Sequence, residues 1–149
     1  MTNDAASEPA RLTAIVDEFA DFEPRERLEA LVEFADQMAP LPAELAEKRD
    51  AEAHRVHECQ TPVFLWVEVR DGRVMIFADV APEAPTVKGF LALLIDALSG
   101  ASPAEVAAVH DDLLQRLGLV DVLGMMRMRG LHAVLYYIRK QAAAAPAEH

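Results

Sequence analysis

The sequence predicts an α+β fold, in which a small antiparallel sheet built on one hairpin is packed by N-terminal and C-terminal helices. Apolar residues recur at helical spacing toward both ends of the chain, whereas the apolar period is two within residues 63–78. Asp71-Gly72, inside that stretch, is a strong signal for a two-residue hairpin turn. We expect one domain over residues 9–141, with disordered tails at 1–8 and 142–149.

Two helices are expected before the sheet. Ser7 is the expected N-cap of the first helix, and Pro24 suits the first turn of the second. Their apolar faces are Leu12, Ile15, Val16 and Phe19 in the first helix and Leu28, Leu31, Val32 and Met38 in the second. Pro40-Leu41-Pro42 ends the second helix, and Ala43 to Asp50 could add a short one.

The first strand is expected to be covered on both faces. One face carries Val63, Leu65, Val67 and Val69, and the other carries Phe64, Trp66 and Glu68. Because both faces are apolar near Phe64 and Trp66, we expect helices on both sides there. The partner strand is expected over Arg73 to Ala78.

A helical period returns after the hairpin, from Val87 to Leu98, and ends near Gly100. Ser102-Pro103-Ala104-Glu105 has the capping-box pattern of a short helix, followed by a broken segment to Gly118. The last helix carries Leu131, Val134, Leu135 and Ile138 on one stripe and frays from Ala142. Met125, Met126 and Met128 precede it; gap-filling core is favoured over an adaptable interaction surface.

The charge excludes some classes of function. The chain of 149 residues carries a net charge of −11, so general binding to nucleic acid or to an anionic membrane is not expected. We expect the charge to serve solubility, with steering toward a basic partner as the alternative. The N-terminus lacks a signal peptide, and no apolar run approaches the ~20 residues that span a bilayer. A reducing cytoplasm is the expected location.

The chain has a single cysteine, Cys59, directly before the first strand. One thiol cannot close an internal disulfide, so it is either a buried bystander or a reactive group. Its polar flanks, His57, Glu58 and Gln60, lead us to expect that it is presented rather than packed away. His54, His57, Cys59 and His110 contain no pair of typical zinc ligands, so no metal site is expected.

Other nucleophile chemistry lacks its usual partners. If the segment is extended, His57 and Cys59 point to the same side, but no group that would orient the histidine is evident. We therefore interpret His54 and His57 as a solvated approach segment. There is no Cys-x-x-Cys pair and no glycine-rich phosphate loop. A one-cysteine peroxidase and a plain interaction module with a structural thiol stay open.

An ordered set of motifs resembles the SufE-like sulfur acceptors of iron–sulfur cluster assembly, over roughly residues 10–140. The motifs are Leu28-Glu29-Ala30-Leu31, Leu41-Pro42, Arg55-Val56-His57-Glu58-Cys59-Gln60-Thr61, Val87-Lys88-Gly89-Phe90 and Arg127-Met128-Arg129-Gly130-Leu131. The chain departs from the family pattern in three places. Glu58 and Thr61 replace a glycine and a serine, Ala81-Pro82-Glu83-Ala84 replaces Asp-Ser-Asp-Ala, and Met125-Met126 replaces Pro-Ser.

The resemblance implies a SufE/IscU-like fold and a role for each matching residue. Cys59 is the expected acceptor of sulfane sulfur, with Val56, Gln60 and Thr61 beside it. Glu83, Lys88 and Arg127 match positions that support the loop or the docking surface. From the residues themselves, Arg55, a protonated His57 or Lys88 could raise the thiolate fraction of Cys59, whereas Glu58 opposes it.

The resemblance also implies partners and the absence of a cofactor on this chain. The donor is a SufS-like cysteine desulfurase that carries pyridoxal phosphate and that the acceptor stimulates. The receiver is a SufBCD-like assembly scaffold. We expect a monomeric accessory protein rather than an enzyme in its own right. An acceptor that serves a second desulfurase system is a close alternative.

Overall fold

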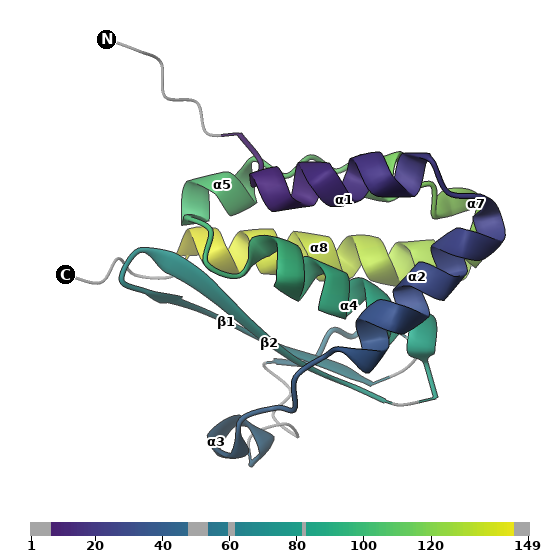
Figure 1. Ribbon diagram of the computed structural model, residues 1–149. Helices are drawn as coiled ribbons and strands as arrows, with labels where there is room; N and C mark the ends of the chain where they lie inside the picture. The colour runs from purple at the N-terminus through teal and green to yellow at the C-terminus, as the bar shows by residue number, and fades with distance from the viewer. Residues whose placement is uncertain (1–6, 48–53, 60–61, 82, 145–149) are drawn as a thin grey trace, which may run out of the picture.

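The computed structural model describes residues 7–47, 54–59, 62–81 and 83–144, and it has the predicted α+β fold (Figure 1). Gln60, Thr61 and part of the short helix predicted after Pro42 lie outside these residues. The described helices are α1 (Ala10–Ala20), α2 (Pro24–Asp36), α3 (Ala43–Ala46), α4 (Pro85–Leu98), α5 (Pro103–Ala107), α6 (Leu113–Arg116), α7 (Val120–Leu123) and α8 (Met125–Ala144). None of them combines the length and the apolar content needed to cross a bilayer.

The sheet is the expected hairpin of β1 (Val63–Arg70) and β2 (Arg73–Val80). The strands pair antiparallel, from Arg70 opposite Arg73 to Val63 opposite Val80. Asp71 and Gly72 have positive φ angles of 54° and 76°, the conformation of a type I′ turn. The turn prediction is therefore confirmed, and β2 extends to Val80, beyond the expected end at Ala78.

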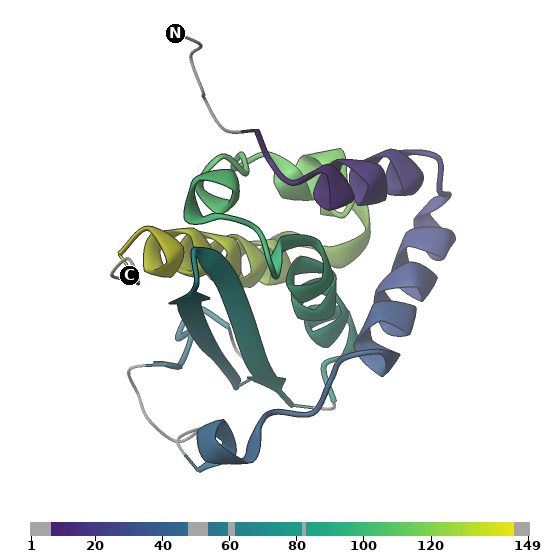
Figure 2. The same cartoon turned by 60° about the vertical axis from the view of Figure 1, so that its left-hand side comes forward.

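Helices α4 and α8 cover one face of the hairpin, and α4 also packs on α2 (Figure 2). Gly89 allows α4 and α2 to cross closely, because a Cβ at this position would lie 2.0 Å from the carbonyl oxygen of Leu31. Phe90, the next residue, is fully buried in the core. Burying an aromatic side chain of this size contributes on the order of 2 kcal/mol.

The prediction of helices on both faces of β1 is only partly right. Helices α4 and α8 pack on one face, but Trp66 is stacked on the ring of His54, at 5.3 Å between ring centroids. The Nδ1 atom of His54 lies 3.2 Å from the carbonyl oxygen of Leu65. Among the described residues, His54 therefore covers Trp66 on the face opposite α4 and α8.

Two of the three predicted helix-start signals are confirmed. Ser102 accepts a hydrogen bond from the amide of Glu105 at 3.1 Å, and Glu105 accepts one from Ser102 at 2.9 Å. This capping box was predicted, as was Pro24 in the first turn of α2. Ser7 as an N-cap was wrong, because α1 begins at Ala10 after Pro9, without a side-chain cap.

Three expectations about exposure and helix ends also change. Val32 is 40% exposed and does not join the buried face of α2. Helix α8 starts earlier than predicted, at Met125, and continues to Ala144, because Ala142 is buried at 1% exposure. Glu8, expected in a tail, accepts hydrogen bonds from both terminal nitrogens of Arg116 at 2.7 and 2.8 Å.

Candidate functional site

Cys59 lies at the end of a turn that leads into β1. The amide of Val56 donates to the carbonyl oxygen of Val63 at 2.9 Å, and the amide of Cys59 donates to that of Val56 at 3.3 Å. Arg55 forms a bridge with Phe64 at the edge of β1. The turn is thus held to the strand by backbone hydrogen bonds on the N-terminal side of the cysteine.

The thiol of Cys59 is packed against the first half of α8. The side chain is 7% exposed, and its sulfur donates a long hydrogen bond of 3.6 Å to the carbonyl oxygen of Gly130. A Cβ at Gly130 would lie only 3.1 Å from the sulfur, so the missing side chain makes room for the thiol. The expectation of a presented thiol is therefore wrong, because α8 covers a segment that looks polar in sequence.

This environment suppresses the thiolate. Burial, followed by the charge of Glu58, raises the pKa of Cys59 from its ordinary value of 9.0 to about 11. The prediction that Glu58 opposes ionisation of Cys59 is confirmed. The expected help from Arg55, His57 and Lys88 does not offset the rise. At pH 7.5 a pKa of about 11 leaves roughly 0.03% thiolate.

The thiol borders a small hollow of about 160 Å³, called here the thiol hollow. Its lining residues are Cys59, Glu83, Ala84, Thr86, Val87, Met126, Arg127, Gly130 and Leu131. Glu83 and Arg127 are exposed, so the hollow reaches the surface, and a guanidinium nitrogen of Arg127 donates to the hydroxyl of Thr86 at 3.4 Å. The structure therefore brings together the predicted residues Cys59, Glu83 and Arg127.

Other predicted residues lie close in sequence but not in the thiol hollow. Val56 is buried at 2% exposure beneath the turn, and Lys88 is half-buried on α4. His57 is exposed while Cys59, two residues later in the same turn, is buried. His54 is half-buried on Trp66, which corrects its interpretation as part of a solvated approach.

Sequence reasoning missed Gly130 and Thr86 as members of the site. Gly130 stood within the quoted Arg127-to-Leu131 motif, and a glycine inside a helical pattern is a signal of close approach. Thr86 carried no such signal, because its place beside Arg127 depends on how α4 and α8 meet.

An exposed apolar surface adjoins the thiol hollow. Met128 is buried as predicted, but Met125 and Met126 are 89% and 69% exposed, so the interpretation of all three as core was wrong. With Val120, which is 42% exposed, they form what we call the methionine platform. They line a second hollow of about 570 Å³ with Glu58, Gln115, Met128, Arg129 and His132. Met126 lines both hollows.

Within the described ranges, no three His, Cys, Asp or Glu side chains are placed to hold a metal ion. The thiol hollow combines the thiol of Cys59 with the charged groups of Glu83 and Arg127.

Comparison with known proteins agrees with this arrangement. The Fe-S metabolism associated domain, SufE, matches residues 13–142, which include the turn of Cys59, the thiol hollow and the methionine platform. The chain belongs to the SufE family. SufE-like proteins are accessory proteins of iron–sulfur metabolism, and the α+β architecture described above is shared with a solved relative.

The SufE family members that resemble the chain span several groups of organisms. An uncharacterized SufE-like protein of Mycobacterium tuberculosis is 36% identical over 94% of this chain and 96% of its own length. A chloroplastic SufE-like protein of Arabidopsis thaliana is 33% identical over 88% of this chain and 50% of its own. The solution structure of a hypothetical protein from Thermus thermophilus has a TM-score of 0.80 at 35% identity, covering 93% and 97% of the two chains.

Proposed function

We propose that this SufE-family protein is a sulfur carrier. In this proposal the protein takes sulfane sulfur from a cysteine desulfurase onto Cys59, stimulates that enzyme and delivers the sulfur to an iron–sulfur assembly scaffold. The observation that carries the proposal is the only thiol of the chain, set beside a surface-open hollow next to an exposed apolar platform. The chain itself would need no cofactor, since pyridoxal phosphate belongs to the desulfurase.

The transfer is a thiol–persulfide exchange. The thiolate of Cys59 attacks the outer sulfur of the donor's persulfide, the donor's sulfur–sulfur bond breaks, and the donor cysteine leaves as a thiolate. Cys59 then carries the added sulfur as a persulfide, and no external oxidant or reductant is consumed. A second thiol in the same chain could attack that persulfide and release sulfide, so a single cysteine suits a carrier.

The resting thiol must be released before it reacts. With the pKa of Cys59 raised to about 11, attack in the resting state is slow at neutral pH, which protects the idle thiol from oxidation. We propose that docking of the donor moves the turn away from Gly130. Breaking the long 3.6 Å hydrogen bond from the Cys59 sulfur to the carbonyl oxygen of Gly130 would cost little free energy in that step.

The thiol hollow suits the loaded state as well. Its volume of about 160 Å³ is several times the ~30 Å³ share of a water molecule, so one added sulfur atom fits beside Cys59. Arg127 at the mouth could pair with a persulfide anion on its way in or out. Glu83 is placed at the same mouth, where it would bind a basic partner side chain.

The methionine platform is the proposed docking surface for the desulfurase. Met125 and Met126 are among the most exposed large apolar side chains described, and flexible methionines pack well against partner surfaces. Arg127 and Arg129 flank them on a chain of net charge −11. The platform thus offers an apolar centre with a local positive rim beside the thiol hollow.

A peroxidase that works without a partner is less well supported. Such an enzyme needs a thiolate in its resting state, and burial disfavours the thiolate of Cys59. The choice between a SufS-like desulfurase and a second desulfurase system depends on the partner and is decided by testing both enzymes.

The test is to mix the protein with each desulfurase and cysteine and to measure intact mass and alanine release. We expect one adduct of about 32 daltons on wild type, none on Cys59→Ser, and faster alanine release with wild type. Met125→Asp should raise the desulfurase concentration needed for half-maximal loading, whereas Tyr136→Asp, at a position 63% exposed farther along α8, should not. The proposal is refuted if neither desulfurase gives the adduct and neither is stimulated.

A further inference from the structure

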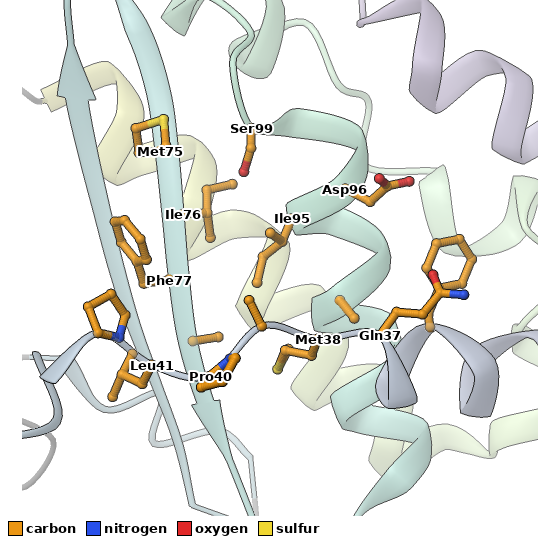
Figure 3. A pocket seen from close by; sticks show the side chains of 15 residues that line it. Gln37, Met38, Pro40, Leu41, Met75, Ile76, Phe77, Ile95, Asp96 and Ser99 are labelled. Atoms are coloured by element: carbon orange, nitrogen blue, oxygen red, sulfur yellow. The ribbon is translucent and has the colours of Figure 1, made fainter.

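A further hollow, called here the edge groove, follows the edge of β2 that faces away from β1 (Figure 3). Its volume is about 440 Å³, in the range of ligand and peptide sites. It lies between the strand, α4 and the connection after α2, and its lining includes Met75, Ile76, Phe77, Ala78, Pro40 and Ile95. It shares no described lining residue with the thiol hollow.

The backbone pattern of β2 shows which atoms face this groove. Arg73 pairs with Arg70 at the hairpin turn, with its amide and carbonyl directed at β1. The amide and carbonyl of the next residue, Val74, therefore point away from β1. The amide of Val74 donates to the carbonyl of Ala101 at 2.7 Å, and its carbonyl accepts from Gly100 at 2.8 Å. Because the direction alternates along a strand, Ile76 also points its amide and carbonyl outward.

Ala78 follows the same alternation. In the parts of the chain that the structure describes, no backbone hydrogen bond reaches Ile76 or Ala78 on this outer side. All four consecutive residues Met75–Ala78 line the groove, although their side chains alternate between the two faces. The groove therefore runs along the strand edge itself, beside backbone donors and acceptors that repeat every ~6.8 Å.

A further polar group lies at one end of the groove. The hydroxyl of Ser99 is buried without a hydrogen-bond partner among the described residues, and Figure 3 shows it directed toward Ile76. Buried polar groups are normally hydrogen-bonded, so an occupant that offers polar atoms here would gain a bond at little cost. The rest of the lining is largely apolar.

We propose that the edge groove binds an extended segment of a partner protein, which adds to the sheet as a third strand beside β2. The outward amides and carbonyls of Ile76 and Ala78, which bond to no described backbone group on that side, would bond to the backbone of that segment, and its alternate apolar side chains would fill the groove. An apolar small molecule would leave those backbone groups unpaired.

The charge of the protein indicates which charged residues the bound segment should carry. No lysine or arginine lines the groove among the described residues, Asp96 of the lining is already paired with Arg11 at 2.7 Å, and the chain carries −11 overall, so the net charge is what favours a basic occupant. The segment is therefore expected to carry Lys or Arg at its ends. The same net charge opposes pairing with the β2 edge of a second copy. Because the groove is separate from the thiol hollow, the partner can stay bound while Cys59 exchanges sulfur.

The test uses the full chain and a synthetic probe with the sequence acetyl-Lys-Val-Thr-Val-Thr-Val-Lys-amide. Amide hydrogen exchange, followed by NMR, should slow at least tenfold at Ile76 and Ala78 when the probe is added, but not at Phe77, which already bonds to β1. Only every second amide of the probe would face β2. N-methylation of that set should weaken binding at least tenfold, whereas N-methylation of the other set should leave binding unchanged. Equal effects of the two sets, or no protection, would overturn the proposal.

Variants separate this proposal from the sulfur-carrier function. Ile95→Lys places a cation on the groove wall and should weaken probe binding at least tenfold, whereas Ala107→Lys adds the same charge on an exposed part of α5 and should not. Cys59→Ser should bind the probe like wild type. Dimers in sedimentation that protect Ile76 and Ala78 without the probe would assign the edge to a second copy and refute a partner strand.

Discussion

Gly130→Ala tests the idea that the first half of α8 holds Cys59 in an unreactive state. The added Cβ would lie 3.1 Å from the Cys59 sulfur, closer than the 3.4–4 Å of ordinary contact, and 3.5 Å from its Cα. The turn must then give by a few tenths of an ångström. Alanine is the better helix former by up to about 1 kcal/mol, so α8 itself should not suffer.

The size of the effect follows from the pKa. If the thiol of Cys59 became fully solvated, its pKa would return from about 11 toward 9.0, which is about a 100-fold gain in thiolate at pH 7.5. A partial displacement gives less. We therefore expect the rate of alkylation by iodoacetamide to rise by at least about 10-fold in Gly130→Ala, with ~100-fold as the ceiling.

The assay is the time course of alkylation by intact mass, with unfolded wild type as the reference. A double-mutant cycle separates the clash from helix propensity. In a Cys59→Ala background the sulfur is absent, so Gly130→Ala should stabilise the protein by up to about 1 kcal/mol. In wild type the same change should stabilise less or destabilise. An unchanged alkylation rate, with no coupling in the cycle, would show that Gly130 does not hold the thiol.

Three further predictions concern pH and local stability. For wild type, the alkylation rate of Cys59 should keep rising toward pH 11. From about pH 9 upward, wild type should lose stability relative to Cys59→Ser, because the thiol ionises readily only in the unfolded state there. Glu58→Gln should lower the pKa of Cys59. Arg116 lowers the pKa of Glu8, so Glu8→Gln should cost about 1 kcal/mol in urea unfolding at pH 7, with wild type losing this advantage as the pH falls below 4.5. Ser102→Ala should cost about 1 kcal/mol through the lost cap, visible as a Tm lower by about 3 °C; an unchanged Tm would contradict the capping role.

The elements of the fold were predictable because their signals are local. The Asp71-Gly72 turn needs positive φ angles at both residues, and the sequence shows residues that adopt them readily. The capping box of Ser102 likewise depends on residues within one turn. The end of α8 was not predicted, since Ala142 is held by burial in the core rather than by any local helix-stop signal.

The sequence predicted which residues form the site but not which of them are buried or exposed. The motif order indicated Cys59, Glu83 and Arg127, and the structure places these three around one hollow. The polar flanks of Cys59 suggested an exposed thiol, whereas contact with Gly130 buries it. Met125 and Met126 looked like core by composition, but the start of α8 turns them outward.

The amino-acid sequence alone determined the hairpin, the α+β class, the family and the single thiol, because each depends on residue type and on short spacing along the chain. Tertiary structure decided how reactive that thiol is and which strand edge is open. Desolvation of Cys59 involves Gly130 of α8, 71 residues away in the chain, and the surroundings of the outer edge of β2 depend on which distant segments pack beside it. Such contacts between distant segments leave little trace in a local sequence pattern.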